Sequence, residues 1–584
     1  MVGWYDPGQL VQTAQQVLIS TIFGRHSDHR LMESLVAGSD TIYDYTFYYK
    51  EDRQGQDIVD EKRPRQEIWI DYVADTGDGW NSTYTVASCV SQPQLTLNDP
   101  DGNQHQTKQG DLLVFGGDEV YPTPSRKLYN ERLIQPYETA LRCTPPPHPH
   151  VFAIPGNHDW YDSLVSFTRL FISKHWFAGW WAPQSRSYFA LKLPHGWWLL
   201  STDVQLGSDI DEPQVGYFRK VAEQMRLQET QEKTRVRIIL CNAEPHWIYA
   251  KTYGKYDSAV YNENNFAFLE DKVLGRKVTV FLAGDLHHYR RHEVKEKDGT
   301  TREKITAGGG GAFLHPTHGS DVSMLNGGYT LQSSFPDVTT SKKLCRYNLI
   351  FPFLNPKFGL LTGLLYMLTS WAVMADIGHY GMSQTGTAMN RAFHDTLISP
   401  VAVFWVLALF GGFWLFTDTH SKWYRRIAGF LHGFAHVIAT FFIGWSATYL
   451  GVSVLVSWKF HLLGHPYTWS FDFKHSPQLI LAGALIFIGG WIIGSFIMGV
   501  YLWVSLNIFG RHTNEAFSSL AIPDWKNFLR LRIDTSGNLT IYPIGIRRVA
   551  RNWKARPAGE TGPELVPDDP QATPPELIEP PIIL

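Results

Sequence analysis

The chain has 584 residues, too many for one compact core, so at least two structural units are expected. Its net charge is −3, and it lacks the long basic stretch with interleaved aromatic residues that is typical of nucleic-acid binding, so we expect no nucleic-acid partner. Four widely spaced cysteines form no CxxC pair, which argues against a disulfide framework or zinc knuckle and favours a reducing compartment. The first 20 residues do not resemble a cleaved signal peptide.

Residues 1–350 are polar and mixed in composition, and five of their apolar runs lead directly into metal-ligand side chains. In chain order these runs are "EIWIDYVADTGDGW", "DLLVFGGDEVYP", "HVFAIPGNHDWYD", "RVRIILCNAEPHW" and "VTVFLAGDLHHYRRHE". The polar residues that follow the runs are Asp75 and Asp78; Asp118 and Tyr121; Asn157, His158 and Asp159; Glu244 and His246; and Asp285, His287 and His288. Short β-branched runs separated by longer segments predict a layered α/β or β-sandwich core.

The loops that follow the strands of such a core converge at one edge, where ligand sites in these folds tend to lie. Aspartate oxygens combined with histidine and asparagine donors suit Mn, Fe or Zn. Two such ions, held a few ångströms apart by a shared carboxylate, clamp the attacking and leaving oxygens of a phosphoryl displacement. The residues therefore predict a metal-dependent phosphoester site.

The ordered set D-x-G, G-D-x-x-Y, G-N-H-D and G-x-x-H, within about residues 65–320, resembles the calcineurin-like metallophosphoesterase superfamily. The resemblance implies an α/β (α+β) fold, a four-layer β-sandwich flanked by helices. It also implies two divalent or trivalent metal ions (Mn, Fe or Zn), with a water or hydroxide that bridges them as the nucleophile of phosphoester hydrolysis.

The resemblance also implies a role for each matching position. Asp75 and His287 would bind the first metal, Asp118 would bridge both ions, and Asn157 would bind the second. His158 would lie beside the scissile phosphate, as proton donor or electrostatic stabiliser, and Asp159 would orient it.

Three positions depart from the usual motifs. Gly77 stands where many members carry a histidine; the purple acid phosphatase branch shares this glycine and uses the tyrosine of G-D-x-x-Y as a ligand. That tyrosine is Tyr121 here, and Asp78 is the competing substitute. Asp285 occupies the place of a histidine ligand to the second metal.

In the fourth motif, Ala243 replaces the usual histidine, and Glu244 or His246 is expected to take its place. After His288 comes "ITAGGGGAFLHPTHGSD", whose glycines either expose backbone N–H groups to phosphate or form a plain turn. His288, His315 and His318 are candidates for phosphate contacts, metal contacts or supporting groups.

Four apolar segments are long enough to span a bilayer: 358–376, 398–417, 427–457 and 478–506. Lysine and arginine residues flank the first span, the loop between the second and third, and the end of the fourth. They predict a multi-pass protein with its head and both termini on the cytoplasmic side. His432 and His436, four residues apart in the third span, predict either a hydrogen-bonded pair that faces the bundle or a metal or haem site.

The sequence thus predicts a metallophosphoesterase domain at 1–350 and a four-helix transmembrane bundle at 351–510. Residues 511–556 contain two strand-like runs around "DTSGN", which predict a hairpin that packs on the first domain. Residues 557–584 are rich in proline and acidic residues and predict disorder.

The leading hypothesis is a membrane-anchored phosphoesterase, mono- or diesterase, whose tether favours a lipid-linked substrate over a soluble nucleotide or phosphoprotein. A second hypothesis is a catalytically degenerate sensor or scaffold that binds a phosphorylated ligand and signals through the bundle. A third, supported by His432 and His436 alone, is a transporter or redox module that the head regulates.

Overall fold

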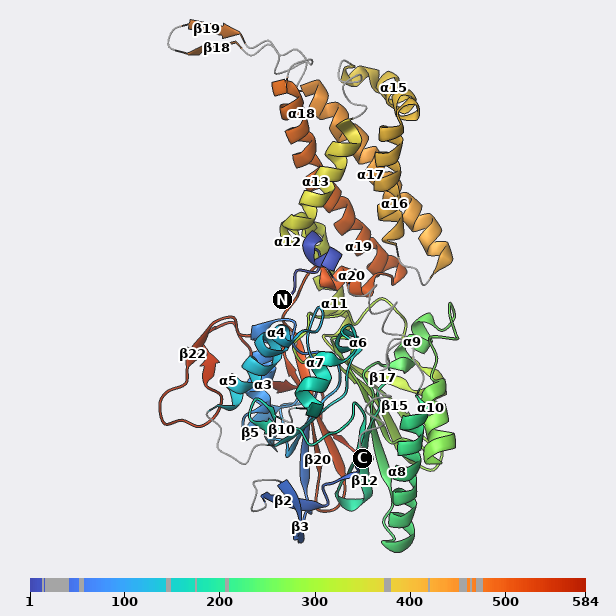
Figure 1. Ribbon diagram of the computed structural model, residues 1–584, viewed down its shortest axis with the longest axis vertical. Helices are drawn as coiled ribbons and strands as arrows, with labels where there is room; N and C mark the ends of the chain where they lie inside the picture. Colours follow the sequence, from blue (N-terminus) through green and yellow to red (C-terminus); the bar gives the residue numbers. More distant parts are fainter. Residues whose placement is uncertain are drawn as a thin grey trace. The chain divides into compact units, whose positions relative to one another are not determined.

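The structure is a computed structural model. It describes residues 1–12, 15, 41–51, 57–142, 149–173, 176–204, 210–371, 380–417, 421–450, 459–462, 465–468 and 476–584. The chain divides into two compact units, which are described separately (Figure 1). The first unit comprises residues 1–2, 12–341 and 521–584, and the second comprises residues 3–11 and 342–520. The C-terminal 64 residues thus belong to the same unit as the predicted metal-binding motifs.

One sheet of the first unit has the strand order β24-β21-β20-β4-β7-β8-β10-β9, and β25 pairs with β21. Its three central strands β4, β7 and β8 are parallel, so their carboxyl ends lie at the same edge of the sheet. The strands are β4 (Ile68–Val73), β7 (Leu112–Phe115), β8 (His150–Ala153), β9 (Trp176–Phe177), β10 (Trp180–Trp181), β20 (Lys526–Ile533), β21 (Leu539–Ile546), β24 (Glu576–Leu577) and β25 (Ile582–Ile583).

The other sheet has the strand order β1-β11-β12-β13-β14-β16-β15-β17. Strands β12, β13 and β14 are parallel, and they again bring their carboxyl ends to one edge. The strands are β1 (Tyr43–Asp44), β11 (Phe189–Lys192), β12 (Trp197–Ser201), β13 (Arg237–Cys241), β14 (Val280–Ala283), β15 (Tyr289–Lys295), β16 (Thr301–Ala307) and β17 (Thr330–Phe335). Smaller pairs are β2 (Phe47–Glu51) with β3 (Asp57–Pro64), β5 (Gln94–Asn98) with β6 (Gln104–Lys108), and β22 (Trp553–Ala555) with β23 (Leu565–Pro567).

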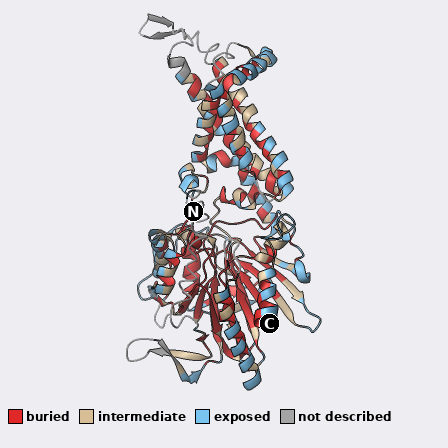
Figure 2. Cartoon of the chain, turned by 45° about the vertical axis from the view of Figure 1, so that its right-hand side comes forward, coloured by how far each residue is buried: buried red, intermediate tan, exposed pale blue. Residues whose placement is uncertain are grey.

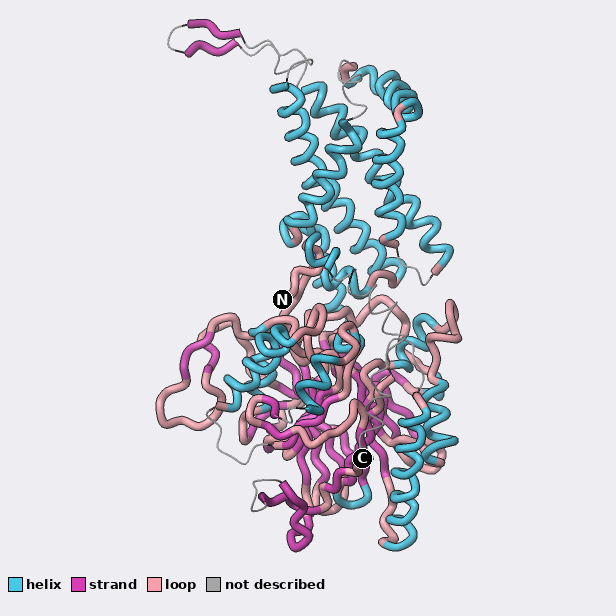
Figure 3. The backbone as a smooth tube through the Cα atoms, in the orientation of Figure 1, coloured by secondary structure: helices cyan, strands magenta, loops and turns pink. Residues whose placement is uncertain are grey.

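The two sheets pack face to face because side chains alternate along each strand. Ile68 and Ile70 of β4 enter a core shared with the other sheet, whereas Trp69 and Val73 enter a second core with helices α3 (Trp80–Val90) and α5 (Gln135–Leu141). A third core lies between the other sheet and helices α8 (Glu212–Gln231) and α9 (His246–Tyr253). Helices therefore cover the outer face of each sheet, and burial is concentrated in the strands (Figures 2 and 3). The predicted mixed α/β class is confirmed.

The C-terminal segment forms a hairpin, β20–β21, at the expected place, and β20 pairs antiparallel with β4. A buried ion pair joins the strands: the Arg530 guanidinium donates to Asp71 at 2.6 Å and 3.1 Å.

The expectation of a disordered tail at 557–584 is wrong, because β24 and β25 both pair with β21. The edge of β21 supplies hydrogen-bond partners that composition alone does not reveal. Buried Leu577 and Ile582 add apolar contacts to the two cores.

The second unit is built mainly from helices. They are α12 (Phe351–Leu354), α13 (Pro356–Trp371), α15 (Thr385–Ile398), α16 (Pro400–Leu415), α17 (Lys422–Tyr449), α18 (Ser476–Gly489), α19 (Ser495–Phe509) and α20 (Thr513–Ser518). Two helical stretches, Lys422–Tyr449 and Ile480–Phe509, are long and apolar enough to cross a membrane, with mean hydropathies of 1.7 and 2.2.

Two further helix pairs reach that standard only when each pair is taken together. Val338–Leu354 and Pro356–Trp371 are bent by 61°, and Thr385–Ile398 and Pro400–Leu415 by 104°. In the described part of the chain, membrane-length helices thus number two, or up to four if each bent pair is one span. Two of the four predicted segments, 427–457 and 478–506, coincide with helices of membrane length, and residues 372–376 and 451–457 of the predicted spans lie outside the described residues.

His432 and His436 lie on α17 and are both buried. The Nε2 atoms of the two rings are 3.3 Å apart, and the Tyr366 hydroxyl of α13 lies 2.8 Å from His436 Nδ1. Phe413 stacks on the His436 ring, with centroids 3.5 Å apart. The pair is thus hydrogen bonded inside the bundle, which is the first of the two predicted alternatives.

Candidate metal centre

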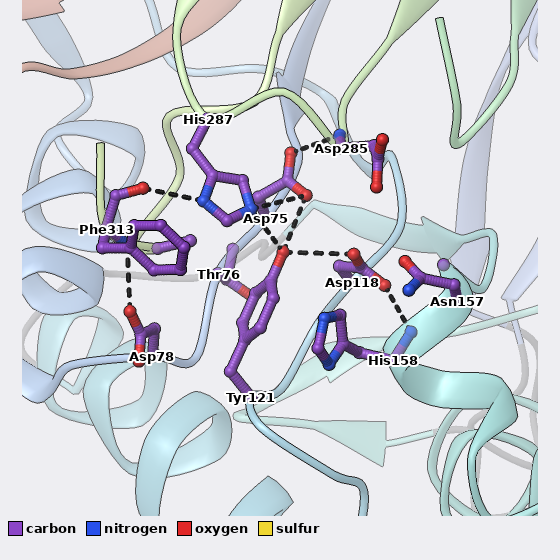
Figure 4. Close-up of polar contacts among 12 residues, drawn as sticks. Asp75, Thr76, Asp78, Asp118, Tyr121, Asn157, His158, Asp285, His287 and Phe313 are labelled. Carbon is purple, nitrogen blue, oxygen red and sulfur yellow. Dashed lines mark hydrogen bonds and ion pairs between the residues drawn. The ribbon is translucent and has the colours of Figure 1, made fainter. Parts of the chain in front are cut away.

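The carboxyl ends of parallel strands from both sheets supply the predicted ligands. Asp75, Asp118 and Asn157 follow β4, β7 and β8, while Glu244 and Asp285 follow β13 and β14. Figure 4 shows that the Asp75, Asp118, Tyr121 and His287 side chains point toward one another. The converging loops predicted from the sequence are therefore present.

The Tyr121 hydroxyl is the centre of this cluster. Its oxygen lies 2.9 Å from Asp75 Oδ1, 3.1 Å from Asp118 Oδ2 and 2.9 Å from His287 Nε2. His287 Nε2 and Asp75 Oδ1 are 3.8 Å apart. Ligand atoms that bind one ion at about 2.0–2.2 Å lie about 3–4 Å from one another. The three distances from the Tyr121 hydroxyl and the Asp75–His287 distance lie in or near this range.

A backbone carbonyl fixes the orientation of His287. Its Nδ1 donates to the Phe313 carbonyl at 2.7 Å, which leaves Nε2 as the atom that faces the cluster. Burial and the nearby charges of His315 and Lys526 lower the pKa of His287 well below its ordinary value. A neutral imidazole with a fixed tautomer is the form that binds metals.

Three of the carboxylates sit on strained backbone. Asp75, Asp118 and Asp285 have φ angles of 58°, 54° and 64°, the left-handed region that non-glycine residues adopt only at a cost. Gly77 also has positive φ, and a Cβ there would lie 2.2 Å from the Glu119 carbonyl oxygen. No side chain fits at residue 77, which explains why this chain lacks a histidine in its first motif.

The carboxylates at the site repel one another. Burial raises the pKa of Asp118 to about 7, and burial together with the charge of Asp118 raises that of Glu244 to about 8. Burial and neighbouring carboxylates also raise the pKa values of Asp75 and Asp285. Among the described residues, no lysine or arginine forms an ion pair with any of the four. A bound cation would relieve this repulsion.

Asn157 presents an acceptor in the same place. Its Nδ2 donates to the Tyr161 hydroxyl at 3.0 Å, whereas its buried Oδ1 has no hydrogen-bond donor in the described part of the chain. The amide lies beside Asp118 (Figure 4). A buried oxygen without a donor, close to carboxylates, suits a cation.

Within the described ranges, no three His, Cys, Asp or Glu side chains are placed to hold a metal ion by themselves. Each candidate donor set therefore depends on another residue type. Tyr121 would complete the set that contains Asp75 and His287, and Asn157 would complete the set that contains Asp285. As placed in this structure, the described side chains therefore do not by themselves form a complete metal site.

The fourth motif favours Glu244 over His246. His246 Nδ1 lies 2.9 Å from Asn242 Nδ2 and 3.0 Å from the Glu244 carbonyl, and its ring packs against the edge of Phe266. The charge of the Glu244 carboxylate instead acts on Asp285. Nδ1 of His246, a predicted metal ligand, thus contacts residues of its own loop. Asp285 has a second neighbour, because the Tyr249 hydroxyl donates to its Oδ2.

His158 lies beside the Tyr121 cluster, with the two ring centroids 4.3 Å apart. Its backbone N–H donates to Asp118 Oδ1 at 2.8 Å, and its Nδ1 donates to the Pro122 carbonyl at 2.7 Å. Burial lowers the pKa of its imidazole to about 4. The Pro122 carbonyl, and not Asp159, therefore orients the ring.

Asp159 has a different task from the predicted one. Its carboxylate accepts the Gly156 N–H at 2.9 Å and the Tyr129 hydroxyl. These bonds hold the turn that carries Asn157 and His158. Asp159 supports the site through the backbone, and its charge acts on the His158 imidazole.

Asp78 is not the substitute for the missing histidine. Its two oxygens accept the backbone N–H groups of Val2 at 2.9 Å and Phe313 at 3.0 Å. It thus anchors the loop that holds His287. Of the two alternatives for the first metal, the geometry favours Tyr121.

The four glycines at 308–311 are required for packing. A Cβ on Gly308 would lie 2.3 Å from Asp75 Oδ2, and one on Gly309 would lie 2.1 Å from Asn527 Nδ2. The Gly310 N–H already donates to the Ala74 carbonyl at 2.8 Å. The plain-turn alternative is therefore better supported than a phosphate cradle.

The candidate histidines after the fifth motif lie around His287. The His315 ring stacks on the His287 ring, with centroids 3.9 Å apart, and His318 Nδ1 lies 2.7 Å from the Ser341 hydroxyl. His288 is buried, and its carbonyl accepts the Gly308 N–H. His315 supports His287, and the contacts of His288 and His318 are with the loops around it.

Sequence reasoning missed a contribution from the C-terminal hairpin. Beyond the β20–β4 pairing, the glycine loop bonds to both chain segments: the Asn527 N–H donates to the Gly309 carbonyl, and the Ala312 N–H donates to the Asp75 carbonyl. Lys526 is fully buried, its Nζ donates to the Ala312 carbonyl, and burial lowers its pKa to about 8. Ile522 accepts the Leu314 N–H at 3.0 Å. The hairpin thus clamps the loop whose Phe313 carbonyl orients His287. Only the pairing of distant strands reveals this role.

Comparison with known proteins gives distant likenesses. No family model and no curated protein matches the chain. Among solved structures, purple acid phosphatase PPD1 from yellow lupin (Lupinus luteus) seeds has 14% sequence identity and a TM-score of 0.30, and the match covers 46% of this chain and 50% of that one. A second structure, PhoD, has 9% identity and a TM-score of 0.27, and the match covers 42% and 58% of the two chains. This chain therefore spans only about half of each of these proteins, and the interpretation rests on the site's own geometry.

Proposed function

We propose that the first unit is a metal-dependent phosphoester hydrolase of the calcineurin-like type. The observation that carries the proposal is the Tyr121 hydroxyl, placed between Asp75, Asp118 and His287 at distances suited to one ion. The repulsion among the carboxylates and the donor-free oxygen of Asn157 support it.

Two donor sets share Asp118. Asp75, Tyr121, Asp118 and His287 would hold one ion, and their mixed oxygen and nitrogen donors suit Fe, Mn or Zn. Asp118, Asn157, Asp285 and Glu244 would hold a second, and their oxygen donors favour a harder ion such as Mn. When bound, the ions supply Lewis-acid polarisation of a phosphoryl oxygen and an acidified water.

The chain's own residues orient these groups and handle the proton. Because Nδ1 of His158 donates to Pro122, Nε2 is the atom at which this ring would exchange a proton with the leaving oxygen. Tyr249 holds the Asp285 carboxylate, and Lys526 holds the loop behind His287. Tyr249 and Lys526 thus position other groups and do not contact the substrate in this proposal.

We further propose that the enzyme is anchored to a bilayer with its head and both termini in the cytoplasm. Two membrane-length helices and the basic residues in their flanks support this placement. A tethered head acts at the membrane surface, which favours a lipid-linked phosphoester as substrate.

The test is hydrolysis of p-nitrophenyl phosphate and bis(p-nitrophenyl) phosphate by the purified full chain with added Mn²⁺. We expect His158→Ala to lower kcat by about 10²–10⁴-fold, the range of a lost acid–base group. Asp118→Asn should also abolish metal retention. Asp321→Asn, an exposed aspartate that contacts Ser323, is the matched control and should keep full activity. Equal activity in all four proteins would contradict the proposal.

A second candidate is a metal-binding sensor without hydrolytic activity. The bond from Tyr249 to Asp285 and the replacement of a histidine by Ala243 favour it, because both weaken the second donor set. Fewer than one ion per chain, together with intact binding of inorganic phosphate, would support the sensor over the enzyme.

A further inference from the structure

The second unit contains a cavity of about 450 Å³ between α15, α16 and α17. Its walls include Met389, Phe393, Val406, Leu407, Val437 and Phe441. The volume lies within the range of about 300–1,000 Å³ that is typical of small-molecule sites. The bend of 104° between α15 and α16 turns α15 back to form one wall.

The described lining of the cavity contains few polar groups. Its polar lining residues are Thr369, Thr396 and Thr440, and no charged residue lines it. Each threonine hydroxyl donates to a backbone carbonyl four residues earlier in its own helix, at 2.7, 2.7 and 2.8 Å respectively. An occupant therefore finds no hydroxyl hydrogen free to donate to it and gains mainly apolar contact, and most polar groups of a ligand would lose their hydration without compensation.

The rim of the cavity is apolar as well. Phe393, Leu397 and Leu407 are exposed by 65%, 62% and 62%. A contiguous apolar surface of this kind is unfavourable in water and ordinary in hydrocarbon. The wall formed by α17 belongs to a helix of membrane length, so lipid chains are the apolar molecules at hand.

We propose that this cavity binds one hydrocarbon chain of a membrane lipid. The inference rests on the lining of the second unit and stands whether or not the first unit is a hydrolase. An apolar cavity of this size left empty would forfeit the contacts of all its lining atoms. A single chain restores those contacts without requiring a polar partner.

The test is native mass spectrometry of the full chain after incubation with mixed micelles of detergent and palmitoyl-oleoyl phosphatidylcholine, followed by extensive detergent exchange. Wild-type protein should retain one lipid mass. Val406→Trp, which fills the cavity, should lose it. Val401→Trp makes the same change on the same helix at a 60% exposed position outside the cavity, and it should retain the lipid.

Thermal unfolding provides an independent measurement. Delipidation should lower the Tm of wild-type protein and of Val401→Trp, but not that of Val406→Trp, whose indole replaces the chain. If Val406→Trp does not fold, the smaller filling variant Val437→Phe replaces it. Equal lipid retention in all variants would overturn the proposal. A change of oligomeric state in the filled variant would do the same, because it would identify a protein segment as the occupant.

Discussion

The buried polar groups of the two units differ in how they are satisfied. In the second unit, Tyr366 bonds to His436 and His436 to His432, and His432 Nδ1 has no hydrogen-bond partner among the described residues. In the first unit, Asp75, Asp118 and Asp285 repel one another, and Asn157 keeps an oxygen without a donor. A buried chain of hydrogen bonds stabilises a fold, whereas a buried cluster of carboxylates that repel one another favours a bound cation.

The largest effect on metal affinity is expected from Tyr121, whose hydroxyl lies at the centre of the carboxylate cluster of the first unit. Tyr121→Phe removes one donor from the Asp75–His287 set and leaves the ring volume unchanged. We expect a loss of metal affinity of at least about 10–100-fold, the size associated with removing a supporting group alone. Metal titration by isothermal calorimetry measures it.

Tyr137→Phe is the matched control, because Tyr137 is a buried tyrosine of the same unit whose hydroxyl has no hydrogen-bond partner among the described residues. It should change metal affinity much less than Tyr121→Phe does. Equal effects of the two variants would mean that Tyr121 is not a ligand.

The C-terminal clamp should give the next largest effect. Lys526→Met removes the cation that holds the Ala312 carbonyl, so the Phe313 carbonyl is expected to release His287. Metal affinity should fall by about tenfold, the lower end for a group that orients a ligand. Calorimetric titration of Mn²⁺ measures it. Lys554→Met, an exposed lysine of the same segment, should have no effect.

The hydrogen-bonded chain of Tyr366, His436 and His432 is expected to affect stability and not metal affinity. Tyr366→Phe should lower the free energy of unfolding of the second unit by about 0.5–2 kcal/mol and leave metal affinity unchanged. Tyr347→Phe, at a 55% exposed position, is the control. Chemical unfolding in detergent, followed beside metal titration, separates the two effects. Loss of metal in Tyr366→Phe would show that the units are not independent in this respect.

The smallest effect concerns pH. Burial lowers the pKa of His292 to about 4, and the charges of Arg290 and Lys304 act in the same direction. Because the unfolded state binds this proton from about pH 6.5 downward, the stabilisation is complete above pH 6.5 and is lost as pH falls toward 4.

For His292 alone, the loss between pH 7 and pH 5 is about 2 kcal/mol. Guanidinium unfolding of wild type and His292→Asn at both pH values measures it. The variant should show a shallower dependence, by up to about one proton. An identical slope in both proteins would contradict the assignment.

The sequence predicts the donor set around Tyr121 better than the donor set around Asp285. The motifs of the first donor set follow strands directly, so the sequence predicts the sheet edge at which its side chains lie. The structure brings together Asp75, Asp118, Tyr121 and His287. The second donor set depends on local loop geometry, and hydrogen bonds within the Glu244–His246 loop turn the imidazole aside. Motif spacing carries no information on that choice.

Distant pairing explains the remaining differences. The tail at 557–584 is acidic and rich in proline, but the edge of β21 gives it a partner. Lys526 resembles a flanking charge until β20 pairs with β4 across more than 450 residues. Hydropathy likewise does not predict the bend between α15 and α16, because it reports only that the segment is apolar and not its direction.

The most direct test of the central claim is the metal content of the purified full chain, measured by inductively coupled plasma mass spectrometry beside that of Asp118→Asn. Asp118 belongs to both donor sets, so its loss affects either ion. We predict at least one Fe, Mn or Zn ion per wild-type chain and its loss in the variant. Wild-type protein that takes up no metal from Mn²⁺, Fe²⁺ or Zn²⁺, or a variant that retains the wild-type content, would contradict the account.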